Sequence, residues 1–372
     1  MSLQELVSVS RRYGADPDYV VAGGGNTSFK DSGTLYVKGS GTSLAAIEAE
    51  GFVRMDRSAL AAIWKKSYPE DSEARESAVL VDLMAARRNG EEAKRPSVET
   101  LLHDILPFAF VVHTHPALVN GLTCSLRGEA AMRELFGDEA LWIPSTNPGY
   151  ILSKVVKDAM DAYAGRRGTA PALIFLQNHG VFVAADSVAG IDAIYRRVVD
   201  ALTARIVRKP GLADGKTEFG PSAEIAAELV RLARGAFGEE TAVAFLRNAE
   251  FVRLTGSRAA FAPVASAFTP DHIVYAGSDP LFVDDRASLA AAWRDAAKDG
   301  RPPKTVALRG LGVFGVGSGE KAARLAVELF ADAAKVACYT EAFGGPRFMT
   351  ADQIDFINNW EVERYRSQIS AH

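Results

Sequence analysis

Three of the chain's six histidines stand beside apolar runs, in two motifs whose spacing suits metal binding. His113 and His115 are two residues apart and follow the apolar run 108–112, which predicts a buried strand. Residues i and i+2 of a strand point to the same face, so these two imidazoles can meet one ion. His179 follows a second apolar run, 173–176, and can arrive from a neighbouring strand or turn. Three imidazole nitrogens with one open position are typical of a catalytic zinc site.

Two nearby histidines serve packing or surface roles more often than metal binding, so a structural interpretation stays open. An upstream acid favours metal chemistry. The apolar-periodic run from Val98 to Leu106 predicts a helix with Ser97 as its N-cap and Glu99 in its first turn. Glu99 could move protons there, or could simply complement the helix dipole. His103 lies four residues later on the same face and could orient Glu99, although a buried structural histidine is the simpler interpretation.

Two glycine-rich loops with hydroxyl side chains precede this helix, at residues 25–28 (Gly-Asn-Thr-Ser) and 38–42 (Lys-Gly-Ser-Gly-Thr). Glycines let backbone N–H groups point into one concavity, an arrangement that cradles phosphate. Each loop taken singly is more often a tight turn. Neither matches a P-loop or a dinucleotide fingerprint, which argues against nucleotide binding as the main function.

The elements that must position these residues alternate between strand and helix. The apolar runs 173–176 and 181–184 predict two strands joined through Gly180, and a long helix is predicted from about Ser187 to Val207. The polar, glycine-containing segment 212–216 predicts a boundary between a domain of residues 1–212 and a domain of residues 213–372.

The second half of the sequence contains a weak echo of the first. A strand, a glycine turn, a strand and a long helix recur around residues 308–317 in the register of residues 176–185, with Leu311 at the position of His179. Residues 274–280 also echo the strand that ends at His113. We interpret this as a degenerate repeat without a metal site, although strand–glycine–strand–helix units are common in unrelated domains.

Composition narrows the possible partners. The 372 residues are 48% hydrophobic and 24% charged, as in ordinary globular proteins, and the net charge is -4. That charge gives no reason to expect nucleic acid or an anionic membrane as a partner. Two distant cysteines fit a reducing compartment. The N-terminal residues lack the apolar core of a signal peptide, and no run is long enough for a membrane span, so we expect a cytoplasmic protein.

Taken in order, the motifs resemble the class II aldolase/adducin family over residues 5–210. The matching pieces are G-N-T-S at 25–28, G-S-G-T at 39–42, P-S-V-E at 96–99, H-T-H-P at 113–116 and N-H-G at 178–180. The length and C-terminal half are similar to the aldolase part of bifunctional rhamnulose-phosphate aldolase/alcohol dehydrogenase proteins. The resemblance implies an α/β fold in which helices flank a central β-sheet, here followed by a second α/β domain.

The resemblance also implies roles for individual residues. Glu99 is the expected general acid/base. Zn²⁺ or another divalent metal is expected on His113, His115 and His179, and the substrate's phosphate on Asn26, Ser40, Gly41 and Ser97. Val98 departs from the fuculose-phosphate aldolases, which have a second phosphate-binding serine there. The phosphate site is therefore expected to be weaker, shifted or built for another group.

The implied function is zinc-dependent (retro-)aldol cleavage of a sugar, in the first instance a ketose phosphate, through an enediolate whose charge the metal stabilises. Two alternatives stay open. One is related enediolate chemistry, by a decarboxylase, epimerase or dehydratase acting on a sugar acid or sugar phosphate. The other is a non-catalytic module like adducin. The resemblance further implies a homo-oligomer, commonly a tetramer.

Overall fold

The computed structural model describes residues 2–360. The chain divides into two units. The first holds Arg127–Arg205 and the described residues up to Thr123, and the second holds Cys124–Leu126 and the described residues from Ile206 onward. The chain thus enters the second unit briefly at residues 124–126 and returns to the first. It passes into the second unit again at Ile206, a few residues before the boundary predicted between residues 212 and 213.

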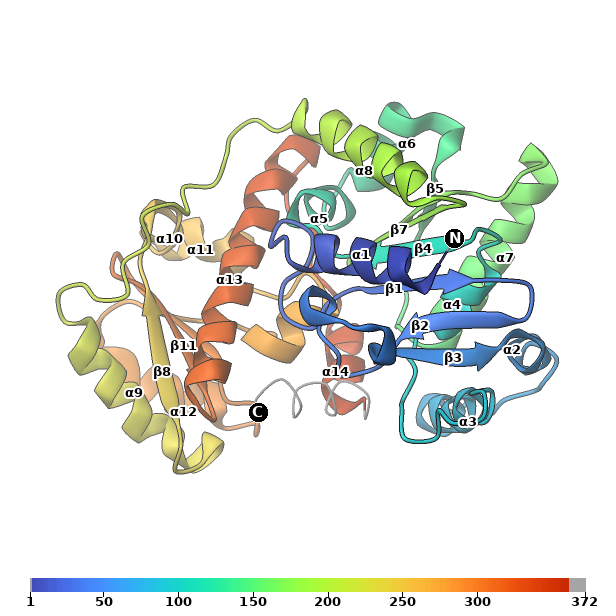
Figure 1. The fold of residues 1–372 in the computed structure, drawn as a ribbon. Helices are drawn as coiled ribbons and strands as arrows, with labels where there is room; N and C mark the ends of the chain where they lie inside the picture. The colour runs from blue at the N-terminus through green and yellow to red at the C-terminus, as the bar shows by residue number, and fades with distance from the viewer. Residues whose placement is uncertain (1, 361–372) are drawn as a thin grey trace. The chain divides into compact units, whose positions relative to one another are not determined.

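The first unit is built on a seven-stranded sheet with the order β3-β2-β1-β4-β7-β6-β5 (Figure 1). Its strands are β1 (Asn26–Lys30), β2 (Thr34–Lys38), β3 (Phe52–Asp56), β4 (Phe110–Thr114), β5 (Leu141–Ile143), β6 (Leu173–Leu176) and β7 (Gly180–Ala185). Neighbouring strands are antiparallel except for the parallel pair β5 and β6. The strands predicted at 173–176 and around 108–112 and 181–184 are present, and β4 is buried along its whole length.

Eight α-helices belong to the described part of the first unit. They are α1 (Leu3–Gly14), α2 (Arg57–Ile63), α3 (Ser72–Ala85), α4 (Thr100–Ile105), α5 (Ala117–Thr123), α6 (Gly128–Phe136), α7 (Tyr150–Arg167) and α8 (Val188–Thr203), with shorter helical turns η1 (Leu44–Ala46), η2 (Ala49–Gly51) and η3 (Gly137–Glu139). Helix α8 starts where it was predicted, because Ser187 caps it by accepting the backbone N–H of Gly190 at 3.1 Å.

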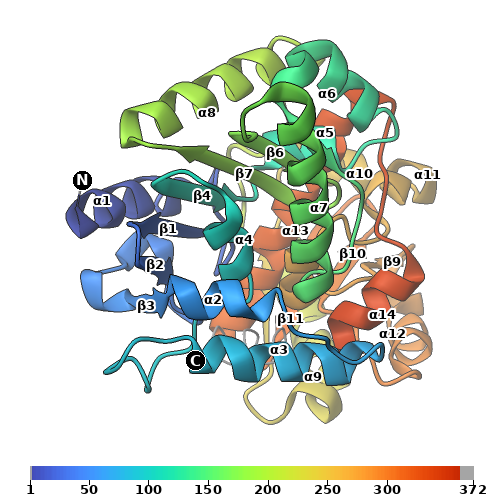
Figure 2. The ribbon, with the colours of Figure 1, turned by 90° about the vertical axis from the view of Figure 1, so that its right-hand side faces the viewer.

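These helices cover both faces of the sheet. Figure 2 shows α8 on one side of β4 and β7, with α4 and α7 on the other side. The second side is a continuous apolar layer in which side chains of α4 and α7 pack on β4, β6 and β7. The helices and the loop after α4 contribute Leu102, Leu106 and Leu152 to this layer, and the strands contribute Val111 and Phe182. The expectation of an α/β fold with a central sheet flanked by helices is confirmed.

The second unit has a smaller sheet, with the order β8-β11-β10-β9. Its elements are α9 (Ser222–Phe237), β8 (Ala242–Leu246), α10 (Ala249–Leu254), α11 (Arg258–Phe261), η4 (Ala262–Val264), η5 (His272–Ala276), β9 (Leu281–Val283), η6 (Arg286–Ser288), α12 (Leu289–Ala297), β10 (Thr305–Leu308), β11 (Gly312–Gly317), α13 (Glu320–Thr340), η7 (Glu341–Phe343) and α14 (Ala351–Asn359). Its core is formed by α9, α12 and the strands, around Leu229, Trp293 and Phe314.

The second sheet repeats the topology of half of the first. The four strands β8, β11, β10 and β9 have the same order and the same relative directions as β4, β7, β6 and β5. Helices α7 and α12 precede β6 and β10, and helices α8 and α13 follow β7 and β11. Matching strand order is the outcome that a degenerate repeat requires.

One part of the predicted repeat is wrong. Residues 274–280 do not form a counterpart of β4, because residues 272–276 form the π-helical turn η5 and β9 begins only at Leu281. The counterpart of β4 is β8, which pairs with β11 as β4 pairs with β7. Short apolar runs are ambiguous between strand and helical turn, and strand pairing decides between them.

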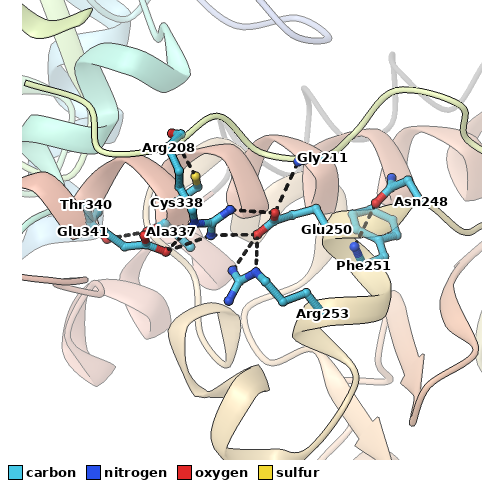
Figure 3. A network of polar contacts seen from close by, with 10 residues as sticks. All are labelled: Arg208, Gly211, Asn248, Glu250, Phe251, Arg253, Ala337, Cys338, Thr340 and Glu341. Carbon is cyan, nitrogen blue, oxygen red and sulfur yellow. Dashed lines mark hydrogen bonds and ion pairs between the residues drawn. The ribbon is translucent and has the colours of Figure 1, made fainter. Parts of the chain in front are cut away.

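A charged network fixes the segment that leads into the second unit. Figure 3 shows the guanidinium of Arg208 between the carboxylates of Glu250 and Glu341, at 2.8 and 2.7 Å. Glu250 is buried, and it also accepts from Arg253 and from the N–H of Gly211. Burial opposes ionisation of Glu250, but the two arginines outweigh it and lower the Glu250 pKa. The network ties residues 208–211 to α10 and to the end of α13.

Among the described residues, no helix combines the length and apolar character needed to cross a bilayer.

Candidate metal and acid–base site

The three predicted metal ligands come together at the edge where β4 ends and β7 begins. Their ligand atoms all lie within 4.8 Å of one another, and the Nε2 atoms of His113 and His115 are 2.9 Å apart. His113 and His115 project from β4 and the residue just beyond it, as the i, i+2 spacing predicted. His179 arrives from the turn between β6 and β7. Its ring centroid is 5.0 Å from that of His113 and 4.9 Å from that of His115.

Backbone geometry explains the Asn-His-Gly motif in this turn. Asn178 has a φ of +57°, a left-handed conformation that asparagine tolerates better than most residues. Gly180 lies so close to β4 that a Cβ there would be 2.5 Å from the carbonyl oxygen of Thr114 and 2.7 Å from the His115 ring. Asparagine and glycine therefore let the turn bring His179 against the other two imidazoles.

A backbone hydrogen bond sets the tautomer of His113. Its Nδ1 lies 2.9 Å from the carbonyl oxygen of Val181 on β7. A carbonyl can only accept, so Nδ1 carries the proton, and the lone pair of the neutral ring is on Nε2. Nε2 is the nitrogen that faces His115. The ring also stacks on Phe182, with centroids 4.1 Å apart, so its orientation is fixed on two sides. This is the support that metal-binding histidines receive in proteins.

Glu99 lies beside the imidazoles with one carboxylate oxygen directed at them. Its Oε1 is 3.4 Å from Nε2 of His113 and 3.6 Å from Nε2 of His179. The side chain is buried, and Oε1 has no hydrogen-bond partner. A buried carboxylate oxygen without a donor is costly. A divalent cation among the three nitrogens would satisfy it, so these residues fit a metal ion.

The other carboxylate oxygen of Glu99 is held by an amide. Asn26 Nδ2 donates to Glu99 Oε2 at 2.6 Å and lies 3.2 Å from Ser97 Oγ. Strand pairing makes this possible, because β1 runs antiparallel to β4 and sets Asn26 directly opposite His113. Gly25, with a φ of +69°, precedes Asn26 at a point where a Cβ would be 2.7 Å from the His113 carbonyl oxygen.

The predicted helix at this site is shorter than expected, and the predicted cap is wrong. Helix α4 begins at Thr100, with Glu99 rather than Ser97 at the N-cap position and no side-chain capping bond. Ser97 Oγ instead lies 3.2 Å from the N–H of Glu99. The Glu99 side chain therefore does not serve the helix end, and its carboxylate is directed into the site.

The residues expected to bind phosphate lie along one connected path. Ser40 donates its hydroxyl to the carbonyl of Pro96 at 3.1 Å, and its N–H donates to the carbonyl of Arg95. Gly41 follows with a φ of +83°. Ser97 follows Pro96 in the chain, and its hydroxyl contacts the side-chain amide of Asn26. The loop after β2 is thus joined through residues 95–97 to the amide that holds Glu99. A role in phosphate binding stays a prediction.

Residues near the site that carried no specific sequence signal complete its support. Ser28 contacts His103, and Phe182 packs against the rings of His103 and His113. The sequence around Gly25 was interpreted as a loop, whereas residues 26–30 form β1. If Asn26 and Ser28 are interpreted as strand residues, their i, i+2 spacing places both side chains on one face of the strand, which is the face towards α4.

Comparison with known proteins identifies the family of the first unit. The family model named Class II Aldolase and Adducin N-terminal domain matches residues 4–199. The chain belongs to the class II aldolase and adducin family. The matched range covers the whole sheet of the first unit, from the start of α1 into α8, and includes Asn26, Glu99 and the three histidines.

Individual relatives of this family member are distant. The uncharacterized oxidoreductase YuxG of Bacillus subtilis is 26% identical over 305 residues, which cover 76% of this chain and 42% of YuxG. The chain therefore spans less than half the length of that relative. The N-terminal class II aldolase domain of a conserved protein from Thermoplasma acidophilum is 29% identical, with a TM-score of 0.45, over 55% of this chain and 93% of that one. An L-fuculose 1-phosphate aldolase is 18% identical, with a TM-score of 0.37, over 54% and 83%.

In the second unit, other residues stand where this class II aldolase family member has its histidines. Phe245 pairs with Phe314 as His113 pairs with Phe182, so Phe245 and, two residues on, Arg247 correspond to His113 and His115. Leu311 occupies the turn position of His179, as predicted. Arg247 donates to the carbonyl oxygens of Gly310 and Leu311.

Proposed function

We propose that this protein catalyses metal-dependent aldol cleavage of a sugar, and the reverse condensation, with Glu99 as the general acid/base. The observation that carries the proposal is the position of Glu99. One oxygen of its carboxylate lacks a hydrogen-bond partner and lies within 3.6 Å of two imidazole nitrogens, while the other is held by Asn26. A carboxylate fixed beside a cation site is the arrangement that proton transfer at an activated carbonyl requires.

Three histidines, His113, His115 and His179, would hold the cation, for which zinc is the best match to an all-imidazole set. The bound ion would supply Lewis-acid activation of a ketose carbonyl and stabilise the negative charge that develops during C–C cleavage. Imidazole nitrogens on one zinc lie about 3.4 Å apart for bonds of ~2.1 Å. The present separations, 2.9 Å between Nε2 of His113 and Nε2 of His115 and at most 4.8 Å within the set, need only small adjustments to reach that value.

The chain's own residues then carry the proton. Glu99 removes the proton from the hydroxyl next to the breaking bond, and it returns a proton to carbon after the aldehyde has left. Its burial limits competition from water at the carboxylate. Asn26 keeps the carboxylate oriented. Hydrogen bonds connect Asn26 to Ser97, and connect the segment before Ser97 to the turn with Ser40 and Gly41. These three residues are suited to hold the substrate's anionic end.

Related enediolate chemistry is the second candidate. Val98 stands between Ser97 and Glu99 and offers no side-chain donor, which favours a substrate without a phosphate, such as a sugar acid. Decarboxylation, epimerisation or dehydration would use the same cation and the same proton carrier. The two candidates differ in whether an aldehyde is a substrate.

The deciding experiment uses the metal-loaded protein with dihydroxyacetone, its phosphate and a panel of aldehydes. We expect C–C bond formation with at least one pair, and we expect it to cease on chelation and return with zinc. Product is measured by mass spectrometry. Absence of product with every pair, together with CO₂ release from a 3-keto sugar acid, would reject the aldolase in favour of the second candidate.

We further propose that the protein works as a cytoplasmic homo-oligomer. Light scattering at micromolar concentration measures the mass directly, and a mass of about 40 kDa, that of one 39.8 kDa chain, would contradict it.

A further inference from the structure

A buried hydrogen-bonded chain leads away from Glu99 into the protein. It passes from Glu99 to Asn26, from Asn26 Oδ1 to Nε2 of His103, and from His103 Nδ1 to Ser28 Oγ at 2.7 Å. All four side chains are buried, and His103 is fully enclosed. None of these bonds is needed to form β1 or α4, because the backbone of each element is already paired.

The chemistry of each group fixes the direction of the bonds. Burial lowers the pKa of His103 well below its usual value, so the ring is neutral and has one donor and one acceptor nitrogen. The Glu99 carboxylate can only accept from Asn26, which assigns Nδ2 to that contact and leaves Oδ1 towards His103. His103 Nε2 must therefore donate. Its Nδ1 must accept, and Ser28 supplies the hydroxyl proton.

The opposite orientation of the amide would be destructive. If the Asn26 side chain were turned over, Oδ1 would lie near 2.6 Å from a carboxylate oxygen, and both atoms would be acceptors. A ring that donates at Nε2 excludes that orientation. The carboxylate and the imidazole thus favour the same orientation of the amide, although the imidazole does not itself touch Glu99.

We propose that His103 is a positioning residue, which holds the Glu99 carboxylate beside the metal ligands through Asn26, while the Ser28 hydroxyl satisfies its other ring nitrogen. The catalytic consequence rests on the proposed function, whereas the structural consequence does not. Loss of the donor at Nε2 leaves Asn26 Oδ1 without its buried partner, so the amide and the Glu99 carboxylate that it holds become less well fixed, which lowers the rate without removing a metal ligand.

A matched pair of substitutions separates this role from packing. His103→Gln and His103→Met have similar shape, and both remove the ring that packs 5.5 Å from Phe182. Only glutamine keeps a donor near the Nε2 position. We expect His103→Met to lower kcat about 10- to 100-fold, as removal of a supporting partner typically does. We expect His103→Gln to stay within about threefold of the wild type and both variants to keep the wild-type metal content.

A second readout does not depend on activity. In protein labelled with ¹⁵N-asparagine, the Asn26 side-chain amide is assigned by its loss in Asn26→Asp. We expect its proton resonance to move towards the shift of solvent-exposed amides in His103→Met and to keep its wild-type shift in His103→Gln. If His103→Met does not fold, Ser28→Ala removes only the hydroxyl that pairs with Nδ1 of His103 and so loosens the ring, and it should move the same resonance in the same direction.

The possible outcomes are distinct. An unchanged Asn26 resonance in His103→Met, or in Ser28→Ala where that variant is used, would overturn the proposal. Equal losses of kcat in the two His103 variants would overturn it as well, because a packing role predicts them. If the wild type is inactive on every substrate, the proposed function fails, and the resonance alone decides the positioning role.

Discussion

Glu99 has the surroundings of a group that moves a proton repeatedly. It is buried, one oxygen is fixed by Asn26, and the other has no donor and faces His113 and His179. A purely structural glutamate would have both oxygens satisfied, as Glu250 does in the second unit. This asymmetry of its partners supports the proposed role of Glu99.

Replacement of Glu99 by glutamine should remove catalysis while the histidines keep their metal. Glutamine retains the shape of glutamate, but its amide cannot act as a general acid or base, so we expect kcat to fall by about 10²- to 10⁴-fold. Metal content is measured on the same sample and should equal that of the wild type. Glu129→Gln, on the exposed face of α6, is the control. Activity that survives in Glu99→Gln would show that another residue carries the proton.

Gly180→Ala tests the close approach that brings His179 to the site. The added methyl would meet the Thr114 carbonyl and the His115 ring, so we expect a loss of about 1–3 kcal/mol in unfolding free energy together with weaker metal binding. Gly165→Ala is the matched control, because Gly165 lies within α7 and an added methyl there would have no neighbouring atom within 4 Å. It should gain about 0.5–1 kcal/mol. Urea unfolding measures both, and equal stabilities would refute the steric argument.

At the scale of elements, Lys30 connects the end of β1 to the end of α4. Its ammonium donates to the carbonyl oxygens of Leu106 and Phe108 at 2.7 and 2.9 Å. Burial lowers the pKa of Lys30 from 10.5 to about 7, partly offset by Asp104. The folded protein therefore releases the Lys30 proton far more easily than the unfolded chain does.

This shift gives a pH dependence of known sign. Between about pH 7 and pH 10.5 the unfolded state binds more protons at Lys30 than the folded state, so its contribution to unfolding free energy rises with pH. The difference in unfolding free energy between wild type and Lys30→Met should thus grow in favour of wild type from pH 7 to about pH 10. Urea titrations at several pH values measure it. A flat or falling difference would contradict the lowered pKa.

The repeated sheet allows a comparison of equivalent turns. His179 and Leu311 occupy the same position in the β6–β7 and β10–β11 turns, and only the first unit has histidines at the related strand positions. We expect about one equivalent of metal per chain. His179→Leu should lose most of it, whereas Leu311→His should leave it unchanged. Atomic emission measures the content, and a second equivalent in the wild type would contradict a repeat without a metal site.

The sequence predicted the metal-ligand histidines better than the residues that hold Glu99 in position. The histidines could be placed because short apolar runs predict buried strands and the i, i+2 spacing fixes the face. The helix start at Ser97 was wrong because local capping preference competes with the pairing of residues 96–97 with the β2 loop. The link from Asn26 to Glu99 depends on the pairing of β1 with β4, a contact between distant segments that no local pattern encodes.

At the scale of the whole molecule, the chain passes between the two units more than once. Residues 124–126 interrupt the first unit and belong to the second, where Ser125 forms a bridge with Pro346 and Leu126 donates to the carbonyl of Gly345. The carbonyl of Cys124 accepts from the N–H of Arg347 at 2.7 Å. A single cut in the sequence therefore cannot separate two complete units.

This arrangement predicts the behaviour of a divided protein. A chain of residues 1–205 alone lacks the partners of 124–126, so its urea midpoint should lie below that of the intact protein. Co-expression with residues 206–372 as a second polypeptide should restore the midpoint and yield a complex that purifies together. Circular dichroism and size-exclusion chromatography provide the measurements. A fragment 1–205 that is as stable alone as in the intact chain would refute the prediction.

The excursion at 124–126 also has a consequence during biosynthesis. These residues leave the ribosome long before residues 345–347, with which they pair. At about 5–20 residues per second, the delay is roughly 10–45 s. Throughout that interval, the backbone groups of residues 124–126 that bond to residues 345–347 in the folded protein lack those partners.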